Sequence, residues 1–376
     1  MKKVLFITGT RADYGKLKPL IRAVEDSSDF EAVVYVSGMH LSKKHGCTYK
    51  EVLHDNFTNV HVAFGLRQSG SMCYDLGNLI CNLTGFVENI HPDLIVVHGD
   101  RIDTLAGAVV GALSNVRVAH IEGGELSGTI DESIRHTVSK LSHIHFACNE
   151  EAARRLKQLG EEENRIFVIG SPDIDIMFSA DLPSFREACA RYEIPFSDYG
   201  ILIYHPVTTE YKRIQHNVEN VVDAILKSKK KYIVIYPNND TGNEFIIAEY
   251  KRFKEAEDRF RIFPSIRFEY FLTLMKHANF IIGNSSAGIR EAGVYGIPAL
   301  DIGTRQKGRY SIEDSSNILH VEESSSEILR AIDQLEKMPH EQNIKFGQGD
   351  SALRFMKVLR EDIWSLPLQK KFVDLE

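Results

Sequence analysis

The chain has 376 residues, more than a single domain usually contains, so we expect two domains, each with its own core. Hydrophobic residues make up 43% of it and the formal net charge is −7, which argues against nucleic acid or an anionic membrane as partner. Five scattered cysteines without C-x-x-C spacing predict reduced thiols, not a disulfide framework. The N-terminal apolar run is too short for a signal peptide and no run reaches membrane-spanning length, so we expect a soluble cytoplasmic protein.

The first half of the chain alternates apolar strands with helical patterns. KKVLFITG and FEAVVYVSG flank the helical pattern KLKPLIRAVEDS, which makes one βαβ unit. The alternation continues through HPDLIVVHGD, VRVAHIEGG, IHFACNE and RIFVIGSP. Such nearly continuous apolar strands are typical of a parallel sheet with helices on both faces. We therefore predict a doubly wound α/β domain over residues 1–178.

A second series of strands follows a break in this rhythm at residues 179–200. ILIYHP, KKYIVIYP, RFRIFPS, NFIIGNSS and IPALDIG predict another doubly wound domain over residues 179–350, facing the first across a cleft. The amphipathic stretch ALRFMKVLREDIW, within residues 351–376, could pack back onto the first domain. Ligands of open α/β sheets bind outside the carboxyl ends of the strands, so candidate site residues are sought there.

The turn after the first strand, TGTRADYGK, suits an anion better than a dinucleotide. It lacks both the G-x-G-x-x-G fingerprint and the G-K-[ST] ending of a P-loop. The second strand ends in YVSG, without an acid for a nicotinamide ribose. Arg11 and Lys16 lie beside a helix start whose N–H groups and dipole favour phosphate. Solvated helix-end charges would explain both residues equally well.

Acidic residues follow two of the predicted strands and begin a helix. Asp100 and Glu122 each come directly after an apolar strand, so their carboxylates should converge. Helix capping is a competing explanation for Asp100, whereas Glu is a poor cap. The T-x-x-E spacing of TIDE predicts a capping box that uses Glu132. Asp131 then lies in the first helical turn, on the same face as Arg135, which can pair with it.

The second domain offers a diphosphate site in NFIIGNSSAGIREAGVYG. Ser285, Ser286 and Gly288 would let a diphosphate approach the N–H groups of a helix start, although Gly and Ser also form ordinary turns. Glu291, one turn further, could accept hydrogen bonds from a ribose diol. His205 ends the strand ILIYHP and is expected to face the same cleft, although a lone histidine is more often structural.

Histidines are numerous, fifteen in all, but they give no metal signature. His136, His143 and His145 cluster in the sequence without H-E-x-x-H or any His pair at i,i+4 spacing. We expect no metal and no cofactor.

Together these motifs resemble the hydrolysing UDP-N-acetylglucosamine 2-epimerases, which begin bacterial sialic acid synthesis. The matching blocks run in order over nearly the whole chain: TGTRADYGKLKPL, HGDRIDTLAGAVVGALS, HIEGGELSGTIDESIRHTVSKLSHIH, GSPDID, HPVTTE, YPNNDTG, FPSIRFEYF and GNSSAGIREAGVYGIPALDIGTRQ. The related non-hydrolysing epimerases carry a T-R-P-E type first turn, Q-G-D in place of His98-Gly99-Asp100, and glutamate in place of Asp131.

The resemblance implies two Rossmann-like domains of the B-type glycosyltransferase architecture, with a UDP-sugar in the cleft. It implies that the catalytic residues are Asp100, Glu122, Asp131 and Arg135, that the diphosphate is held by Arg11, Lys16, His205, Ser285, Ser286 and Gly288, and that the ribose is held by Glu291. The implied reaction removes UDP to give 2-acetamidoglucal and then adds water, releasing N-acetylmannosamine. Relatives form homodimers or homotetramers, and we expect the same here.

Three alternatives remain open. The same reaction on UDP-2,4-diacetamido-2,4,6-trideoxyglucose, in the legionaminic acid pathway, would differ in contacts to C4 and C6 of the sugar. A B-type glycosyltransferase would need an acceptor, and the acidic block around Glu122 exceeds what simple transfer requires. A nucleotide-sugar sensor without activity would show no turnover.

Overall fold

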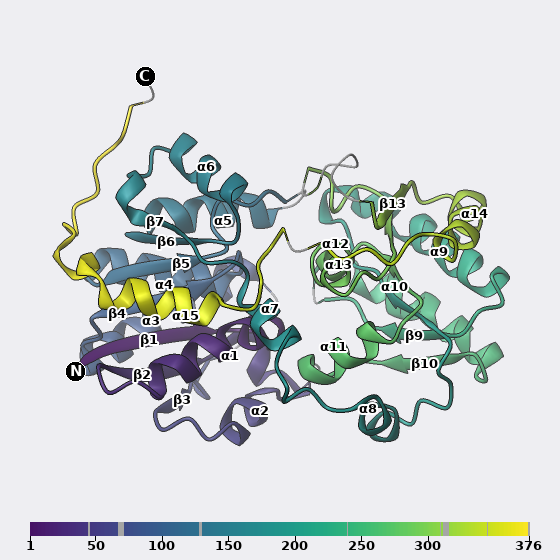
Figure 1. The fold of residues 1–376 in the computed structure, drawn as a ribbon, viewed down its shortest axis with the longest axis horizontal. Helices are drawn as coiled ribbons and strands as arrows, with labels where there is room; N and C mark the ends of the chain where they lie inside the picture. The colour runs from purple at the N-terminus through teal and green to yellow at the C-terminus, as the bar shows by residue number, and fades with distance from the viewer. Residues whose placement is uncertain are drawn as a thin grey trace. The chain divides into compact units, whose positions relative to one another are not determined.

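A computed structural model describes residues 1–43, 46–66, 71–127, 130–238, 240–308, 310, 316–343 and 345–374. The chain divides into two compact units (Figure 1). Unit 1 contains Met1–Glu125, Ile130–Ser179 and Lys345–Glu376, and unit 2 is formed chiefly by Ala180–Ile344. Within the described residues, no helix combines the length and the apolar character needed to cross a bilayer.

Unit 1 is built on a seven-stranded parallel sheet in the order β3-β2-β1-β4-β5-β6-β7. Its strands are β1 (Lys2–Thr8), β2 (Phe30–Val36), β3 (Val60–Val62), β4 (Leu94–His98), β5 (Arg117–Ile121), β6 (Ile144–Ala147) and β7 (Ile166–Val168). Its helices are α1 (Arg11–Glu25), α2 (Tyr49–His54), α3 (Met72–Ile90), α4 (Ile102–Leu113), α5 (Ile130–Leu141), α6 (Glu150–Gln158), α7 (Pro172–Met177) and α15 (Ser351–Arg360). Order 3-2-1-4-5-6 is that of doubly wound nucleotide-binding folds.

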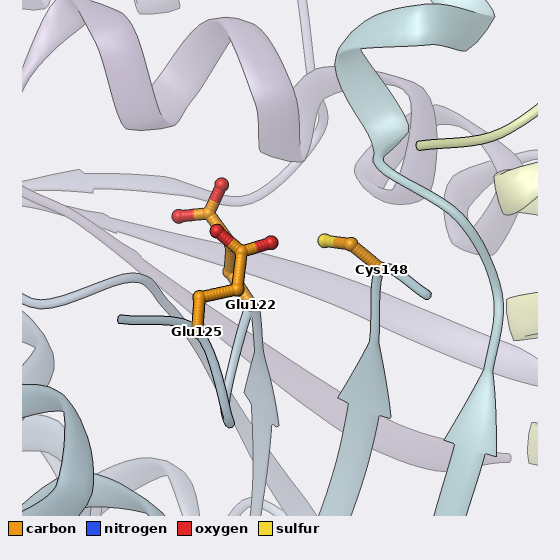
Figure 2. A group of neighbouring side chains, drawn as sticks. All are labelled: Glu122, Glu125 and Cys148. Carbon is orange, nitrogen blue, oxygen red and sulfur yellow. The ribbon is translucent and has the colours of Figure 1, made fainter. Parts of the chain in front are cut away.

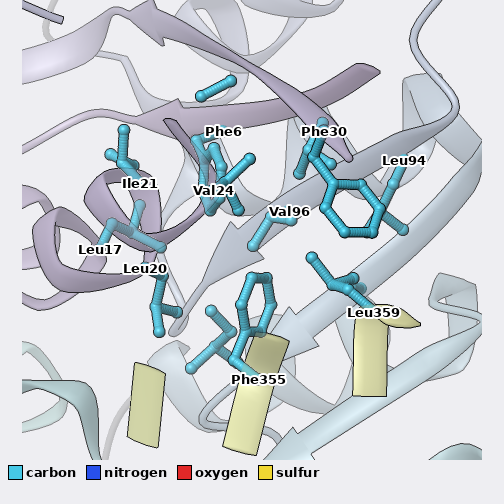
Figure 3. Packing of buried hydrophobic residues seen from close by; sticks show 14 of the residues in the cluster. Phe6, Leu17, Leu20, Ile21, Val24, Phe30, Leu94, Val96, Phe355 and Leu359 are labelled. Carbon is cyan, nitrogen blue, oxygen red and sulfur yellow. The ribbon is translucent and has the colours of Figure 1, made fainter. Parts of the chain in front are cut away.

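Side chains of successive residues in β1 enter separate cores on the two faces of this sheet. Phe6 packs with α1 and with Phe355 and Leu359 of α15 (Figure 3), and Val4 belongs to the same cluster. Leu5 packs in a separate cluster with α3, α4 and α5. Because successive side chains of a strand point to opposite faces, a continuously apolar strand requires helices on both. The last helix therefore completes a face of the first unit's core.

Unit 2 repeats the plan with a six-stranded parallel sheet in the order β10-β9-β8-β11-β12-β13. Its strands are β8 (Gly200–Ile203), β9 (Tyr232–Ile235), β10 (Phe260–Phe263), β11 (Phe280–Gly283), β12 (Ala299–Ile302) and β13 (Ile318–Val321). Its helices are α8 (Phe185–Arg191), α9 (Ile214–Lys227), α10 (Asn243–Tyr250), α11 (Phe268–Lys276), α12 (Ser286–Ile289), α13 (Glu291–Val294) and α14 (Ser325–Leu335). The prediction of two doubly wound parallel α/β domains is confirmed.

Candidate functional site

The carboxyl edge of the first sheet gathers the acidic residues that the sequence singled out. Glu122 directly follows β5, and Asp100 follows β4. The chain turns sharply at both places, since Gly99 and Glu122 have φ angles of 77° and 71°. The Gly99 N–H donates to Ile121 O at 3.0 Å, and the Glu122 N–H donates to Phe146 O at 3.1 Å. These bonds fix both turns to the neighbouring strands.

Arg135, in α5, lies between acidic residues. Its guanidinium donates to the Asp100 carboxylate, and its Nη1 lies 3.5 Å from Glu125 Oε2. The side chain is only 2% exposed, and burial alone would lower its pKa. The negative charges of Asp100, Glu125 and Asp131 raise that pKa overall, so Arg135 stays a cation. The sequence predicted its pairing with Asp131, and the structure adds the two other carboxylates.

Lys16, in α1, also lies between two carboxylates. Its ammonium is 3.1 Å from Glu122 Oε1 and 3.6 Å from Asp173 Oδ2. His98, the last residue of β4, approaches Glu122 from another side, with 3.9 Å between Nε2 and Oε2. The sequence assigned Lys16 to a diphosphate, and that role stays a prediction. Its partners among the described side chains are acids of the candidate site.

Asp131 lies in the first turn of α5, one helical turn before Arg135, and is buried. The predicted capping box places its Ser/Thr at Thr129, which lies outside the described residues. Its other member, Glu132, lies 3.7 Å from His136 Nε2 on the helix surface. Arg11 begins α1, and its Nε donates to Glu51 Oε2 of α2 at 2.9 Å.

Cys148 and Glu125 complete the buried cluster and were not predicted to belong to it. Figure 2 shows the Cys148 thiol pointing toward the carboxylates of Glu122 and Glu125. The potential ligand atoms of these three residues lie within 4.8 Å of one another. However, burial raises the pKa of the Cys148 thiol well above its usual range, helped by nearby acids, and Lys16 already supplies a cation to Glu122. These residues suit an ammonium–carboxylate cluster better than a divalent metal.

Asp173 is a third residue that the sequence did not single out. It follows Pro172 at the start of α7, just beyond β7. The same rule about the carboxyl ends of strands would have found it. The Ser-Pro-Asp pattern resembles an ordinary helix start, where Pro is favoured at the first position. The pattern therefore gave no sign that Asp173 belongs to the site.

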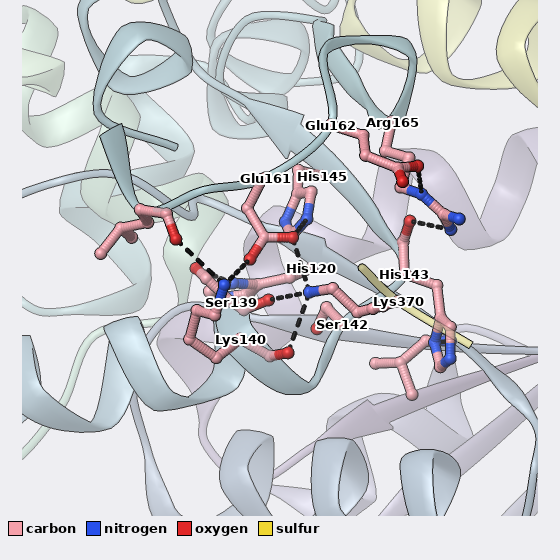
Figure 4. Close-up of polar contacts among 12 residues, drawn as sticks. His120, Ser139, Lys140, Ser142, His143, His145, Glu161, Glu162, Arg165 and Lys370 are labelled. Atoms are coloured by element: carbon pink, nitrogen blue, oxygen red, sulfur yellow. Dashed lines mark hydrogen bonds and ion pairs between the residues drawn. The ribbon is translucent and has the colours of Figure 1, made fainter. Parts of the chain in front are cut away.

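A buried polar network behind α5 supports the site (Figure 4). His120 Nε2 donates to Gly99 O at 2.8 Å, and its Nδ1 lies 3.0 Å from Ser139 Oγ, so one neutral tautomer links the turn before Asp100 to α5. Burial lowers the pKa of His120 to about 3. Further out, Lys370 of the C-terminal segment lies 2.6 Å from Glu161 and donates to the Ser139 and Lys140 carbonyls.

In unit 2, the residues predicted to bind the nucleotide follow the carboxyl ends of β8 and β11. The His205 N–H donates to Asn284 Oδ1 at 2.6 Å, and the Asn238 N–H donates to His205 Nδ1 at 3.0 Å. Ser285 caps α12 by accepting from the Ala287 N–H at 3.3 Å. Ser286 and Gly288 lie in that one-turn helix.

A small cavity in unit 2 is lined by residues of β11, β12 and α12, including Gly283, Ser285, Gly288 and Asp301. Gly283 has φ 132°, and a Cβ there would lie 1.9 Å from Ile203 O, so no other residue fits this turn. Glu291 begins α13 and is 4% exposed. The nucleotide roles of these residues remain predictions.

Comparisons with known proteins agree with this architecture. The model of the family UDP-N-acetylglucosamine 2-epimerase matches residues 22–360. A relative from Neisseria meningitidis serogroup B, named UDP-N-acetylglucosamine 2-epimerase, is 47% identical over 380 residues and covers 100% of both chains. A relative from Legionella pneumophila, named UDP-N,N'-diacetylbacillosamine 2-epimerase (hydrolyzing), is 31% identical and covers 100% of this chain and 98% of its own.

Solved structures show the same fold. The structure of a UDP-GlcNAc 2-epimerase from Neisseria meningitidis, bound to UDP-GlcNAc, has a TM-score of 0.80 at 20% identity and covers 95% of this chain and 99% of its own. A glycosyltransferase from Rickettsia africae has a TM-score of 0.55 at 13% identity, covering 97% and 99%. By its family match and its full-length similarity, the chain belongs to the UDP-N-acetylglucosamine 2-epimerase family.

Proposed function

We propose that the chain is a hydrolysing 2-epimerase, which converts UDP-N-acetylglucosamine and water into UDP and N-acetylmannosamine for sialic acid synthesis. The observation that carries the proposal is the charge balance at the carboxyl edge of the first sheet. Two cations, Lys16 and Arg135, lie there among five carboxylates. These carboxylates are those of Asp100, Glu122, Glu125, Asp131 and Asp173. Cleavage of the anomeric C–O bond builds positive charge on the sugar ring, and an excess of carboxylates stabilises that charge.

The first step would be an elimination. A carboxylate takes the C2 proton, the C–H electron pair forms the C1–C2 double bond, and the C1–O bond breaks with its electrons leaving on UDP. Asp100 or Asp131 is our choice for this base. Either would be a carboxylate held near the Arg135 cation, which keeps a neighbouring acid ionised.

The second step would be a hydration of 2-acetamidoglucal. The electron pair of the C1–C2 double bond takes up a proton at C2 on the face opposite to the one that lost its proton, water adds its oxygen to C1 and gives a proton to a carboxylate, and the product is N-acetylmannosamine with C2 inverted. Glu122 is our choice for the C1 chemistry. One carboxyl group cannot serve both faces of the ring, so at least two groups with different protonation states are required.

Support for hydrolysis comes from the residues that differ from the non-hydrolysing pattern. His98 replaces a glutamine in Q-G-D, and its Nε2 lies 3.9 Å from the Glu122 carboxylate. Asp131 replaces a glutamate and lies buried in the same cluster of charges as Arg135. The changes therefore fall on residues next to the groups proposed to handle water.

The test is incubation with UDP-N-acetylglucosamine in D2O, followed by NMR. We expect UDP and free N-acetylmannosamine with deuterium at C2, and no product from Glu122→Gln, although that variant still binds UDP. UDP-N-acetylmannosamine as product, or a retained C2 proton, would contradict the proposal. A parallel reaction with the UDP-2,4-diacetamido-2,4,6-trideoxy sugar decides between the two substrates, and we expect the higher kcat/KM for UDP-N-acetylglucosamine.

A further inference from the structure

Asp173 is a buried carboxylate that, within the described residues, lacks the hydrogen bonds that usually stabilise such a group. Its exposed fraction is 1%, and within the described residues neither of its oxygens has a hydrogen-bond partner. Burying an ionised carboxylate without hydrogen bonds is strongly unfavourable unless a cation lies close by. The cation present is Lys16, whose ammonium is 3.6 Å from Oδ2.

Lys16 joins Asp173 to the catalytic cluster. The same ammonium lies 3.1 Å from Glu122 Oε1, so one cation is shared by two carboxylates. The three residues come from α1, α7 and the end of β5, and α1 packs directly on α7. Lys16 is only 9% exposed, so water does little to screen either interaction.

We infer that Asp173 is a positioning residue for the proposed reaction: it holds the Lys16 ammonium so that Lys16 neutralises Glu122 only in part. The inference rests on the proposed function. With Asp173 ionised, Glu122 keeps enough negative charge to face a positive C1 and can still exchange a proton. Without the negative charge of Asp173, the Lys16 ammonium interacts with Glu122 alone and forms a tight ion pair with it.

Other charged and titratable groups also face Glu122 and remain in place when Asp173 changes. They are His98 at the end of β4, Glu125 in the loop after β5, and Cys148 after β6. A change at Asp173 alone therefore reports on the shared ammonium.

The test is Asp173→Asn, which keeps the shape of the side chain and removes its charge. We expect kcat to fall about 10- to 100-fold, with KM changed less than about threefold. The substrate still binds, but Lys16 then neutralises Glu122 more fully, which slows the chemical step. The acid limb of the kcat profile should move to lower pH, since a negative neighbour favours the protonated form and has been removed.

The matched control is Asp175→Asn, two residues further along the same helix. Asp175 accepts from the N–H groups of Ser351 and Ala352, so this variant should lose stability while the pH profile stays in place. If Asp173→Asn behaves like this control, with lower stability and an unmoved acid limb, Asp173 is merely structural and the inference is wrong.

A readout without substrate separates this inference from the proposed function. In protein with carboxyl-13C glutamate, the Glu122 resonance is identified by its loss in Glu122→Gln and titrated by NMR. We expect its midpoint to move to lower pH in Asp173→Asn. An unmoved midpoint overturns the inference. A shifted midpoint in a protein that does not turn over UDP-N-acetylglucosamine sustains the effect of Asp173 on Glu122 and overturns the proposed function instead.

Discussion

Glu122, which we propose for the chemistry at C1, has an unfavourable backbone conformation. Its φ of 71° lies in the left-handed region, which residues other than Gly, Asn and Asp seldom adopt. The conformation turns the side chain out of the line of β5 toward Lys16, while the N–H stays bonded to Phe146 O. Strain of this kind at a functional position persists because the surrounding structure enforces it.

Replacing Glu122 by Gly should separate strain from chemistry. Glu122→Gly and Glu122→Gln both remove the carboxylate and should both be inactive. Only the Gly variant relaxes the backbone, so we expect its free energy of unfolding to exceed that of the Gln variant by about 1 kcal/mol. Urea unfolding followed by the fluorescence of Trp364, the single tryptophan, measures the difference. A Gly variant less stable than the Gln variant would show that no strain is stored there.

Sequence rules at this scale find acids better than their partners. The position after a strand identified Asp100 and Glu122, because the parallel sheet places every carboxyl end at one edge. Lys16 is 106 residues from Glu122, and their contact depends on β4 lying between β1 and β5. That strand order is a tertiary fact that local spacing does not contain, so Lys16 was assigned by its helix start alone.

The helix α15 shows how one element depends on a distant residue. Its N-cap residue, Asp350, makes no capping hydrogen bond and pairs with Arg354. The N–H groups of Ser351 and Ala352 donate instead to Asp175 of α7, at 2.9 and 2.7 Å. Amphipathic periodicity therefore predicted the helix, but the cap that fixes its start comes from 176 residues away.

Removing this cap should loosen the helix from unit 1. Asp175→Ala leaves two N–H groups at a partly buried helix start without acceptors, and we expect the free energy of unfolding to fall by about 2 kcal/mol. Trp364 follows the helix and stacks on Phe30, so its fluorescence reports the loss. The control is Asp350→Ala, which should change stability by less than about 0.5 kcal/mol. Equal effects of the two variants would disprove the role of Asp175.

Over the whole molecule, the strands that sequence patterning missed lie at the edges of the two sheets. β3 and β13 are edge strands, and both mix exposed and half-buried residues. Central strands are buried on both faces and stand out as apolar runs, whereas an edge strand has one neighbour and needs fewer apolar residues. Patterning therefore found the central strands and the edge strands β7 and β10, and it missed one edge strand of each sheet.

We expect acid to destabilise unit 1, because it contains buried histidines. Burial lowers the pKa of His40 and of His143 to about 4, and that of His120 to about 3. Between these values and the ordinary 6.5, the unfolded chain binds protons that the folded chain does not, so stability falls as the pH falls. Each of these histidines lowers the free energy of unfolding by about 2 kcal/mol between pH 7 and pH 5. Asp103, whose pKa burial raises to about 6, acts in the opposite sense and offsets about 1 kcal/mol.

We therefore expect the free energy of unfolding of unit 1, followed by Trp364 fluorescence in urea, to fall by several kcal/mol from pH 7 to pH 5. His120→Asn should reduce this fall by about 2 kcal/mol, because it removes one titrating group, even though the variant is less stable at pH 7. His216→Asn, at an exposed position of α9, is the control and should leave the fall unchanged. The pH dependence, rather than the absolute stability, is the quantity that decides. If the free energy of unfolding falls equally in wild type and in His120→Asn, protonation of His120 does not cause the acid sensitivity. Other groups must then cause it.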